Sequence, residues 1–303
     1  MDTNEGDRMK KIAAIVVTYN PESDFEANIS SYINQVEIVI IIDNCSSPEA
    51  LLLVNKFASR NENCILVKNM ENFGIARALN VGILKAIELS CENVIFFDQD
   101  SKATSNLIKK LSKSFKILSE KNNLAMVGPV PVEEKYLNAE HNDETEVYSL
   151  TSFLITSGTY SSVDIFSKIG FFEDKYFIYH VDTEFCLRAL KEGYLIYRID
   201  NAILIHNDGN KVMRRFFGRQ IYVNNYNDIR HYYSVRNLFF LSRSYFKCFP
   251  KKLIIFHIKE LWDGLKIIMF ENNKRKKLGL KFKGFRDFLT GKQGAIELGD
   301  EIE

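Results

Sequence analysis

The chain has 303 residues, of which 46% are hydrophobic and 26% are charged, and its formal net charge at pH 7 is +1. This composition excludes a chain that is disordered throughout and predicts one large domain with an appendage, or two modest domains. The five cysteines are scattered without a Cys-x-x-Cys pair, which predicts reduced cytosolic thiols and no zinc or redox site of that kind. The sequence shows neither a secretory signal pattern nor an apolar run as long as a bilayer span, so we expect a cytoplasmic protein.

The first hundred residues alternate between apolar runs and helical spacing. Continuous apolar runs at residues 12–18, 38–42, 64–67 and 94–97 are typical of strands buried in a parallel sheet. Helical spacing separates them, most clearly from Ile75 to Ile87. This alternation predicts an open α/β sheet, in which ligands bind beyond the carboxyl ends of the strands.

Beyond residue 149 the pattern is less regular. We expect, in order, a strand through Ile155, a helix start near Ser161, a helix at residues 181–192, and strands at residues 195–197 and 202–205. From Asp228 onward helical spacing dominates. A domain boundary is therefore expected near Asn225.

Two carboxylates follow the fourth apolar run directly. Asp98 and Asp100, separated by Gln99, would emerge together at the ligand-binding edge of the sheet. Carboxylate oxygens at that place can hold a divalent metal against a diphosphate. The alternative is an ordinary turn at the end of a strand, because Asp is a common turn residue.

Seven segments in this order resemble the family 2 glycosyltransferases, in particular their rhamnosyltransferases. The segments are residues 17–20, 43–45, 72–76, 98–100, 157–158, 182–188 and 230–237. The resemblance spans most of the chain and implies the nucleotide-diphospho-sugar transferase (GT-A type) fold, a Rossmann-like mixed sheet flanked by helices with a C-terminal helical appendage. On this basis we predict a polar tail at residues 1–10, a catalytic domain at 11–225 and a basic helical region at 226–303.

The first two segments would hold the nucleobase and the ribose of a sugar nucleotide. The resemblance implies this role for Thr18, Tyr19, Asn20, Asp43 and Asn44. A carboxylate at Asp43 could accept a hydrogen bond from the ring imide of uracil or thymine, which cytosine lacks. The alternative is that these residues only terminate two strands.

Other segments imply further contacts to the nucleotide sugar, from Gly74, Arg77, Ser157, Gly158, Arg230 and Arg236. Gly74 permits close backbone approach, and Arg77 lies one turn into the helix, where an anionic donor would be. An ordinary solvated arginine is the alternative for Arg77. For Arg230 and Arg236 the alternative to diphosphate pairing is a helix that packs its tyrosine face and solvates its arginine face.

The resemblance also implies a site for Mg²⁺ or Mn²⁺. Asp100 would be the principal ligand, Asp98 would contact the metal or the ribose, and His206 would be a third contact to the metal or the diphosphate. The metal neutralises the leaving diphosphate. A purely structural histidine is the alternative for His206.

Asp182 is the implied catalytic base, because it keeps the family's spacing to Arg188. The chain departs from the family pattern at Val181, where a glutamate is expected. A single carboxylate that deprotonates the acceptor suffices for inversion. The alternatives are that Asp182 caps a helix and that Glu184 and Arg188 form a plain helical ion pair.

The C-terminal region is basic. Between Arg243 and Lys292, 14 Lys or Arg oppose 4 Asp or Glu, a balance of 14 − 4 = +10. An apolar helical segment from Leu253 to Phe270 is interrupted by charges, so it is too polar to span a bilayer. It could lie on an anionic membrane at the inner face of the cell, pack on the core, or form a homodimer. Nucleic-acid binding is disfavoured, because no binding motif accompanies the charges.

The resemblance therefore implies an inverting, metal-dependent hexosyltransferase. The sugar would be L-rhamnose from dTDP-rhamnose, placed on a glycan or lipid-linked acceptor during synthesis of a bacterial surface polysaccharide of the cell envelope. Another UDP- or dTDP-sugar is an alternative donor. A sugar nucleotidyltransferase is less consistent, because the loop after Val17 is neither glycine-rich nor basic, and a non-catalytic binding protein of this fold is a further rival.

Overall fold

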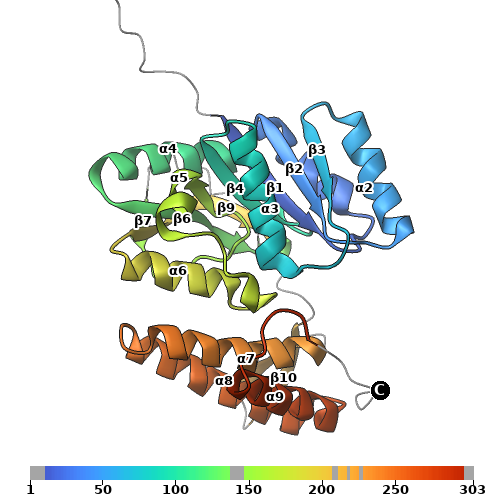
Figure 1. Ribbon diagram of the computed structural model, residues 1–303, viewed down its shortest axis with the longest axis vertical. Coiled ribbons are helices and arrows are strands. Elements are labelled where there is room, and N and C mark those ends of the chain that lie inside the picture. The colour runs from blue at the N-terminus through green and yellow to red at the C-terminus, as the bar shows by residue number, and fades with distance from the viewer. Residues whose placement is uncertain (1–10, 137–146, 207–210, 217–218, 225–227, 297–303) are drawn as a thin grey trace, which may run out of the picture. The chain divides into compact units, whose positions relative to one another are not determined.

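The computed structural model describes residues 11–136, 147–206, 211–216, 219–224 and 228–296, and the chain divides into two compact units (Figure 1). The sheet unit takes in the described residues of 1–73, 77–172 and 185–207. The helical unit takes in those of 74–76, 173–184 and 208–303.

Four parallel strands form one half of the sheet, in the order β3-β2-β1-β4. They are β1 (Ile12–Thr18), β2 (Ile38–Asp43), β3 (Cys64–Lys68) and β4 (Asn93–Asp98). Their apolar runs are covered by helices, which is why β1, β2 and β4 are buried along nearly their whole length. The register places Thr18 beside Asp43 and Val17 beside Asp98, so three strands end at one edge.

Five further strands extend this sheet, and their antiparallel pairings make it mixed, as predicted. Strand β4 pairs with β8 (Tyr160–Ser162), β8 with β6 (Leu124–Val132), and β6 runs parallel to β9 (Leu195–Ile205). Both β5 (Lys102–Ala103) and β7 (Tyr148–Leu150) pair antiparallel with β9. Within the described residues, the sheet thus has nine strands.

The helices of the sheet unit connect and cover these strands. They are α1 (Phe25–Ser30), α2 (Pro48–Arg60), α4 (Leu107–Lys121) and α5 (Asp164–Ile169), with most of α3 (Gly74–Glu88) and of α6 (Val181–Lys191), and the 3₁₀ turns η1 (Ile33–Gln35) and η2 (Glu134–Tyr136). Helix α2 begins with Pro48 at its first position, and the hydroxyl of Ser47 accepts a hydrogen bond from the amide of Ala50.

Four predicted elements between residues 149 and 205 are wrong in detail. Ile155 is exposed and lies outside any strand. Ser161 belongs to β8, where its hydroxyl donates to the carbonyl of Ala125, and the helix begins only at Asp164. The two strands expected at 195–197 and 202–205 are one strand, because β7 pairs with its polar middle at Arg198.

The helical unit contains three long helices, in agreement with the predicted C-terminal helical appendage. They are α7 (Asp228–Tyr245), α8 (Pro250–Phe270) and α9 (Lys274–Leu289), accompanied by the hairpin β10 (Lys211–Phe216) and β11 (Arg219–Asn224), the turn η3 (Asp174–Tyr176) and the first residues of α6. The sequence analysis did not predict the hairpin. In the part of the chain that the structure describes, no helix combines the length and apolarity needed to cross a membrane.

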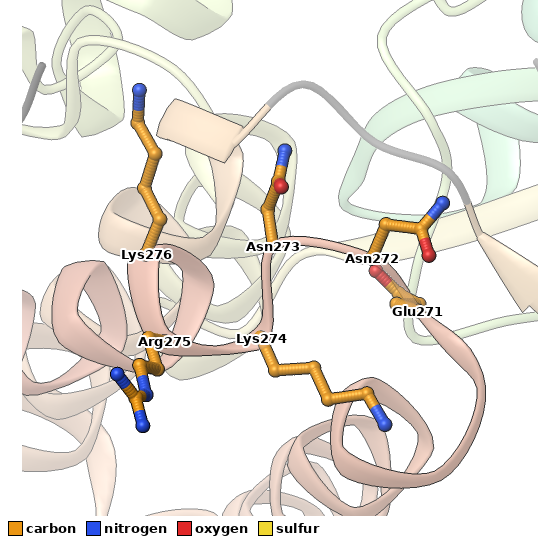
Figure 2. Close-up of a pocket in the computed structure, with 6 residues that line it drawn as sticks. All are labelled: Glu271, Asn272, Asn273, Lys274, Arg275 and Lys276. Atoms are coloured by element: carbon orange, nitrogen blue, oxygen red, sulfur yellow. The ribbon is translucent and has the colours of Figure 1, made fainter.

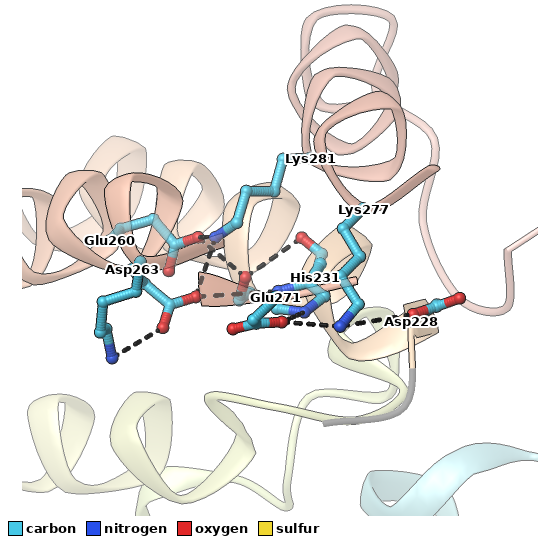
Figure 3. Close-up of polar contacts among 9 residues, drawn as sticks. Asp228, His231, Glu260, Asp263, Glu271, Lys277 and Lys281 are labelled. Carbon is cyan, nitrogen blue, oxygen red and sulfur yellow. Dashed lines mark hydrogen bonds and ion pairs between the residues drawn. The ribbon is translucent and has the colours of Figure 1, made fainter. Parts of the chain in front are cut away.

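A partly buried polar network joins the three long helices (Figure 3). Lys281 of α9 forms ion pairs with Glu260 and, at 3.3 Å, with Asp263, both on α8. Lys277 of α9 lies 2.6 Å from Glu271 at the end of α8. From α7, Nδ1 of His231 lies 3.7 Å from Asp263. Pairing of this kind offsets the cost of taking charges out of water, and it places the acidic side chains of α8 inside the unit.

Candidate nucleotide-sugar and metal site

Thr18 and Asp43 form a buried pair at the ends of β1 and β2. Both side chains are essentially inaccessible, and the hydroxyl of Thr18 donates to Oδ1 of Asp43 at 3.2 Å. Oδ2 of Asp43 accepts a hydrogen bond from the amide of Ser46 at 3.1 Å. These contacts fit the turn-forming alternative, while each carboxylate oxygen retains a lone pair for a further donor. Contact with a nucleobase remains a prediction.

The loop after β1 is tied to the loops after β2 and β4. The amide of Tyr19 donates to Oε1 of Gln99 at 2.8 Å, although the ring of Tyr19 itself is exposed. Asn20 has a positive φ of 48°. Its amide donates to Ser46 Oγ at 2.9 Å, and its Oδ1 accepts from the amide of Ser47 at 2.7 Å. Sequence reasoning missed Gln99 and Ser46, whose polar side chains join the three strand ends.

Asn44 connects the end of β2 to the start of α3. Its Nδ2 donates to Oδ1 of Asn72 at 2.8 Å, and its Oδ1 accepts from the amide of Phe73 at 3.2 Å. The guanidinium of the exposed Arg77 lies over the ring of Phe73, 4.0 Å from its centre. Arg77 is therefore placed on the surface by a cation–π contact with a neighbouring turn.

Gly74 belongs to the helical unit, where it is packed against Phe177. It has φ +78°, and a Cβ at this position would lie 2.5 Å from the carbonyl oxygen of Phe177. The amide of Ile75 donates to the same oxygen at 2.7 Å. Close packing thus requires glycine here irrespective of any nucleotide, and the predicted donor contact is left untested.

Asp98, Asp100 and His206 come together as a cluster with metal-binding chemistry. One potential ligand atom from each lies within 4.8 Å of the others. Asp98 ends β4, and the pairing of Lys102 with Ile205 across β5 and β9 carries His206 to the same place. Two carboxylates and an imidazole suit Mn²⁺ well, whereas Mg²⁺ prefers an all-oxygen set.

Two buried serines support this cluster. The amide of Asp98 donates to Ser157 Oγ at 3.2 Å, and Ser157 Oγ donates to Ser101 Oγ at 2.8 Å. Ser101 Oγ in turn lies 2.9 Å from Nδ1 of His206. Gly158, with φ +79°, would place a Cβ only 2.5 Å from the ring of Pro129. Sequence reasoning missed Ser101, although its position directly after Asp100 was a usable signal.

Asp182 lies in the first turn of α6 and is partly buried. Its Oδ1 accepts hydrogen bonds from the amide of Thr183 at 2.6 Å and from the hydroxyl of Thr183 at 3.2 Å. Burial raises the pKa of this carboxyl above its ordinary value, although the bonds from Thr183 act in the opposite direction. A carboxyl with a raised pKa is a candidate for acid–base chemistry.

The other polar residues of α6 have structural contacts. Glu184 is buried and accepts a hydrogen bond from the hydroxyl of Tyr245 at 2.6 Å. Arg188 donates to the carbonyls of Ile169 and Phe171, both at 2.8 Å. These contacts extend well beyond the plain helical pair that was the alternative for the two residues.

The structure separates Arg230 from Arg236. Arg230 is exposed in the first turn of α7. Arg236 has no exposed surface, and its guanidinium donates to the carbonyls of Gly294 and Lys175 at 2.7 and 3.1 Å. This burial is at odds with the predicted diphosphate contact of Arg236, because its donors are used inside the helical unit. The alternative was a helix that packs its tyrosines and solvates its arginines. It is right for the tyrosines and for Arg230, but wrong for Arg236, which is packed together with the tyrosines.

The family model described as glycosyl transferase family 2 matches residues 13–182. The dTDP-rhamnosyl transferase RfbF of Shigella flexneri is 34% identical over 247 residues, which cover 77% of this chain and 80% of that protein. The low-salt glycan biosynthesis hexosyltransferase Agl10 of Haloferax volcanii is 24% identical over 259 residues, or 78% of this chain and 76% of that protein.

Two solved structures share the fold at low sequence identity. GalNAc-T7, crystallised with UDP, GalNAc and Mn²⁺, has a TM-score of 0.61 and 12% identity, with 95% of this chain covered. This chain spans only 57% of the length of that one. The mannosyltransferase PcManGT from Pyrobaculum calidifontis, in complex with GDP-Man and Mn²⁺, has a TM-score of 0.59 and 15% identity, with 96% of this chain and 77% of that chain covered.

Proposed function

The chain belongs to glycosyl transferase family 2 and has the GT-A type fold, and from this premise we propose that it transfers L-rhamnose from dTDP-rhamnose with inversion. Its activity as a glycosyltransferase follows from the family. The sugar and the nucleotide are supported by the relative named as a dTDP-rhamnosyl transferase, at 34% identity. Another dTDP- or UDP-linked sugar is the nearest rival donor.

The observation that carries the proposal is the cluster of Asp98, Asp100 and His206. It lies where β1, β2 and β4 end, the edge at which open α/β sheets bind their ligands. Both structural neighbours contain Mn²⁺ together with a nucleotide or nucleotide sugar. A bound Mn²⁺ or Mg²⁺ would supply positive charge to the leaving diphosphate. Asp98, Asp100 and His206 would hold the metal, and the contact of His206 with Ser101 would orient the imidazole.

Donor recognition would fall to the loops after β1 and β2. Asp43 can accept a hydrogen bond from the imide of a thymine or uracil ring, because both of its oxygens keep acceptor capacity beside the bonds from Thr18 and Ser46. Tyr19 presents an exposed ring at the same edge. Asn44, Arg77, Ser157 and Gly158 would complete this part of the site.

Asp182 would take the proton of the acceptor hydroxyl as that oxygen attacks the anomeric carbon. One carboxylate is enough for a single displacement with inversion. The raised pKa of Asp182 makes its carboxylate a stronger base than an exposed aspartate. The acceptor would be a glycan or a lipid-linked glycan of a bacterial surface polysaccharide.

The test is binding and transfer with three donors, dTDP-rhamnose, UDP-glucose and GDP-mannose, with and without Mn²⁺. We expect a rise in melting temperature with dTDP-rhamnose that depends on Mn²⁺, because a ligand that binds the native state stabilises it. Asp100→Ala should lose this response and keep the melting temperature of the apo protein, since Asp100 is exposed. Glu120→Gln, an exposed acid on α4, is the control. A Mn²⁺-dependent response retained by Asp100→Ala would contradict the assignment.

The same experiment separates the rival classes. A sugar nucleotidyltransferase would form sugar nucleotide from nucleoside triphosphate and sugar phosphate. A non-catalytic protein would bind donor but neither transfer nor hydrolyse it. Release of dTDP from dTDP-rhamnose, slow in water and faster with acceptor, would exclude both.

We further propose that the acceptor is met at an anionic membrane, to which the outer face of α8 binds. Exposed apolar side chains line one face of this helix with helical spacing: Ile254, Ile255, Ile258, Leu261, Trp262, Leu265 and Ile268. Leu261 is 72% exposed and Ile258 is 59% exposed. An exposed apolar stripe that includes a tryptophan suits the interfacial region of a bilayer.

In the helical unit, acidic side chains lie in internal ion pairs, whereas many basic side chains are exposed. The four acidic side chains between residues 246 and 296, Glu260, Asp263, Glu271 and Asp287, are paired with lysines inside the unit. Burial raises the pKa of Asp263, but the ammonium groups of Lys281 and Lys266 prevail and hold that pKa below its ordinary value. Because these acids are held in ion pairs within the unit, cations dominate its outer surface.

The cations gather around the turn between α8 and α9. Figure 2 shows the hollow at this turn, lined by Glu271, Asn272, Asn273, Lys274, Arg275 and Lys276. Lys274, Arg275 and Lys276 are exposed, as are Lys251 and Lys259 on α8. Basic groups beside an apolar stripe favour anionic lipid over neutral lipid. This charge complementarity is our reason for choosing a membrane over a second copy of the chain.

Vesicle flotation tests the surface. The parent protein should bind vesicles that contain phosphatidylglycerol more strongly than vesicles of phosphatidylcholine alone. A Leu261→Ser, Leu265→Ser variant and a Lys274→Gln, Arg275→Gln, Lys276→Gln variant should each lose binding, with unchanged mass by light scattering. If the first variant converts a dimer to a monomer while vesicle binding persists, the stripe is an interface between copies and the membrane assignment is wrong.

A further inference from the structure

The segment between η3 and α6 has an unusual backbone. Phe177 has φ 61° and ψ −67°, and the amide of Ile178 donates to the carbonyl of Tyr176 at 2.6 Å. This is a γ-turn with positive φ at its centre, the rare and strained form. Tyr179 and His180 also have positive φ, 72° and 63°. Three of the seven non-glycine residues with positive φ in the described chain thus lie within four positions.

Two consecutive residues of α7 hold this segment by its carbonyl groups. Nδ2 of Asn237 lies 2.9 Å from the carbonyl oxygen of Tyr176 and 2.8 Å from those of Ile178 and Tyr179. Nη2 of Arg236 donates to the carbonyls of Lys175 and Tyr176, at 3.1 and 3.3 Å. Both side chains are fully buried. The side chains therefore act on carbonyls on both sides of the strained turn.

Arg236 also fixes Asn237. Its Nε donates to Oδ1 of Asn237 at 3.0 Å, which leaves the amide nitrogen facing the segment. The guanidinium lies near the rings of Tyr232 and Tyr233, 5.1 and 4.9 Å from their centres. Among the described residues its hydrogen bonds all go to neutral acceptors. Burying a charge is costly unless each of its donors has an acceptor. The hydrogen bonds of Arg236 meet this requirement and fix the position of its guanidinium.

The held segment leads directly into α6. The amide of Glu184 donates to the carbonyl of His180 at 2.9 Å, so the last strained residue starts the helix. The ring of Phe177 stacks on Tyr233, with 5.3 Å between ring centres and 14° between planes. Asp182 is two residues beyond His180 and lies in this first turn of α6.

We propose that Arg236 and Asn237 are positioning residues, which fix the strained segment at residues 175–180 and thereby the place of the Asp182 carboxylate. This rests on the proposed function of Asp182 as the base. A positioning role is compatible with the burial of Arg236, whereas the predicted contact with the diphosphate is not. A strained backbone next to a reacting group persists only where its surroundings hold it.

The test compares Asn237→Ala and Arg236→Lys with Leu241→Ala, a fully buried change on the same helix. We expect the first two to lower kcat by between about tenfold and a hundredfold and to keep the donor KM within about twofold of the parent. Hydrogen exchange at residues 175–181 should accelerate in both. Leu241→Ala should lower the melting temperature but keep kcat and the exchange at 175–181. Arg236→Lys retains the charge, so it carries the test if Asn237→Ala fails to fold.

Two results would overturn the proposal. One is parent kcat in folded Asn237→Ala or Arg236→Lys, and the other is an equal loss of kcat in Leu241→Ala. Asp182→Asn, measured alongside, separates the two levels of the argument. If Asp182→Asn transfers sugar normally, the base is wrong and the role of the pair falls with it. If Asp182→Asn is inactive while Asn237→Ala is fully active, the base stands and the pair alone is refuted.

Discussion

The hydroxyl of Ser101 lies 2.9 Å from Nδ1 of His206 and leaves Nε2 as the nitrogen available to a metal. Ser101 is fully buried and accepts a hydrogen bond from Ser157. In the tautomer that keeps its proton on Nδ1, His206 also donates to Ser101 and has Nε2 free for a metal. An acceptor behind a ligating imidazole fixes its tautomer and its orientation. The relationship connects residues 105 positions apart through the pairing of β5 with β9.

We therefore expect Ser101→Ala to weaken Mn²⁺ binding by about tenfold or more. The measurement is titration of Mn²⁺ in the presence of dTDP, followed by electron paramagnetic resonance. Ser161→Ala is the matched control, because Ser161 is as buried but donates to the carbonyl of Ala125. Equal Mn²⁺ affinity for the parent and Ser101→Ala would show that the serine has no part in the metal site.

Asp43→Asn should weaken binding of dTDP. The amide keeps one acceptor oxygen, so either the hydroxyl of Thr18 or the amide of Ser46 loses its partner. We expect a stability loss of about 1 kcal/mol from that bond and, separately, a weaker charge-assisted contact with thymine. Calorimetry measures the dTDP affinity of the parent and of Asp43→Asn at a temperature where both are folded. Unchanged dTDP affinity would make Asp43 a turn residue only.

Gly74→Ala should destabilise the fold more than Gly193→Ala does. Both glycines have positive φ, +78° and +81°, so each alanine has a backbone cost of about 1–2 kcal/mol. Only at Gly74 would the new Cβ also meet Phe177, 2.5 Å from its carbonyl oxygen, whereas nothing lies within 4 Å at Gly193. Thermal unfolding of both variants isolates the clash. Equal losses of stability in the two variants would mean that Phe177 shifts to accommodate the Cβ at little cost.

The parallel half of the sheet was predictable because each strand contains one apolar run, which is buried in β1, β2 and β4 and partly buried in the edge strand β3. The other half was not. Strand β5 has two residues and β8 has three, which is too short for a hydrophobic pattern, and the apolar run that begins β6 is interrupted by Gly128, Pro129 and Pro131. Helix α4 was missed although Leu107, Leu111, Phe115 and Leu118 repeat at helical spacing and are buried.

The metal cluster could be predicted from the ends of the strands, but the serines that hydrogen-bond to it could not. Asp98 and Asp100 are adjacent to an apolar run, whereas Ser157, which accepts a hydrogen bond from the amide of Asp98, is 59 residues away in sequence. The burial of Arg236 was equally hidden, because its acceptors are backbone carbonyls at Lys175, Tyr176 and Gly294. Carbonyl groups are common to all residues, so no residue type marks such a site.

The last prediction concerns Asp182 as the general base. Asp182→Asn should keep donor and Mn²⁺ affinity but lower kcat by about a hundredfold to ten thousandfold, because an amide cannot accept the acceptor's proton. Glu184→Gln is the control. Because Glu184 is buried and accepts from Tyr245, it should cost stability of about 1 kcal/mol, more than an exposed helical pair would, and keep most of the activity.

The pH dependence gives a second signature of Asp182. Burial raises its pKa in the folded state, so the active carboxylate is lost as pH falls through a value above the roughly 3.9 of an exposed aspartate. The folded protein then binds this proton more tightly than the unfolded chain does, and at neutral pH the ionised carboxylate opposes folding. Asp182→Asn should therefore lower turnover as stated above without lowering the melting temperature at pH 7. If Glu184→Gln is instead the inactive variant and Asp182→Asn still transfers sugar, the base lies two residues further along α6.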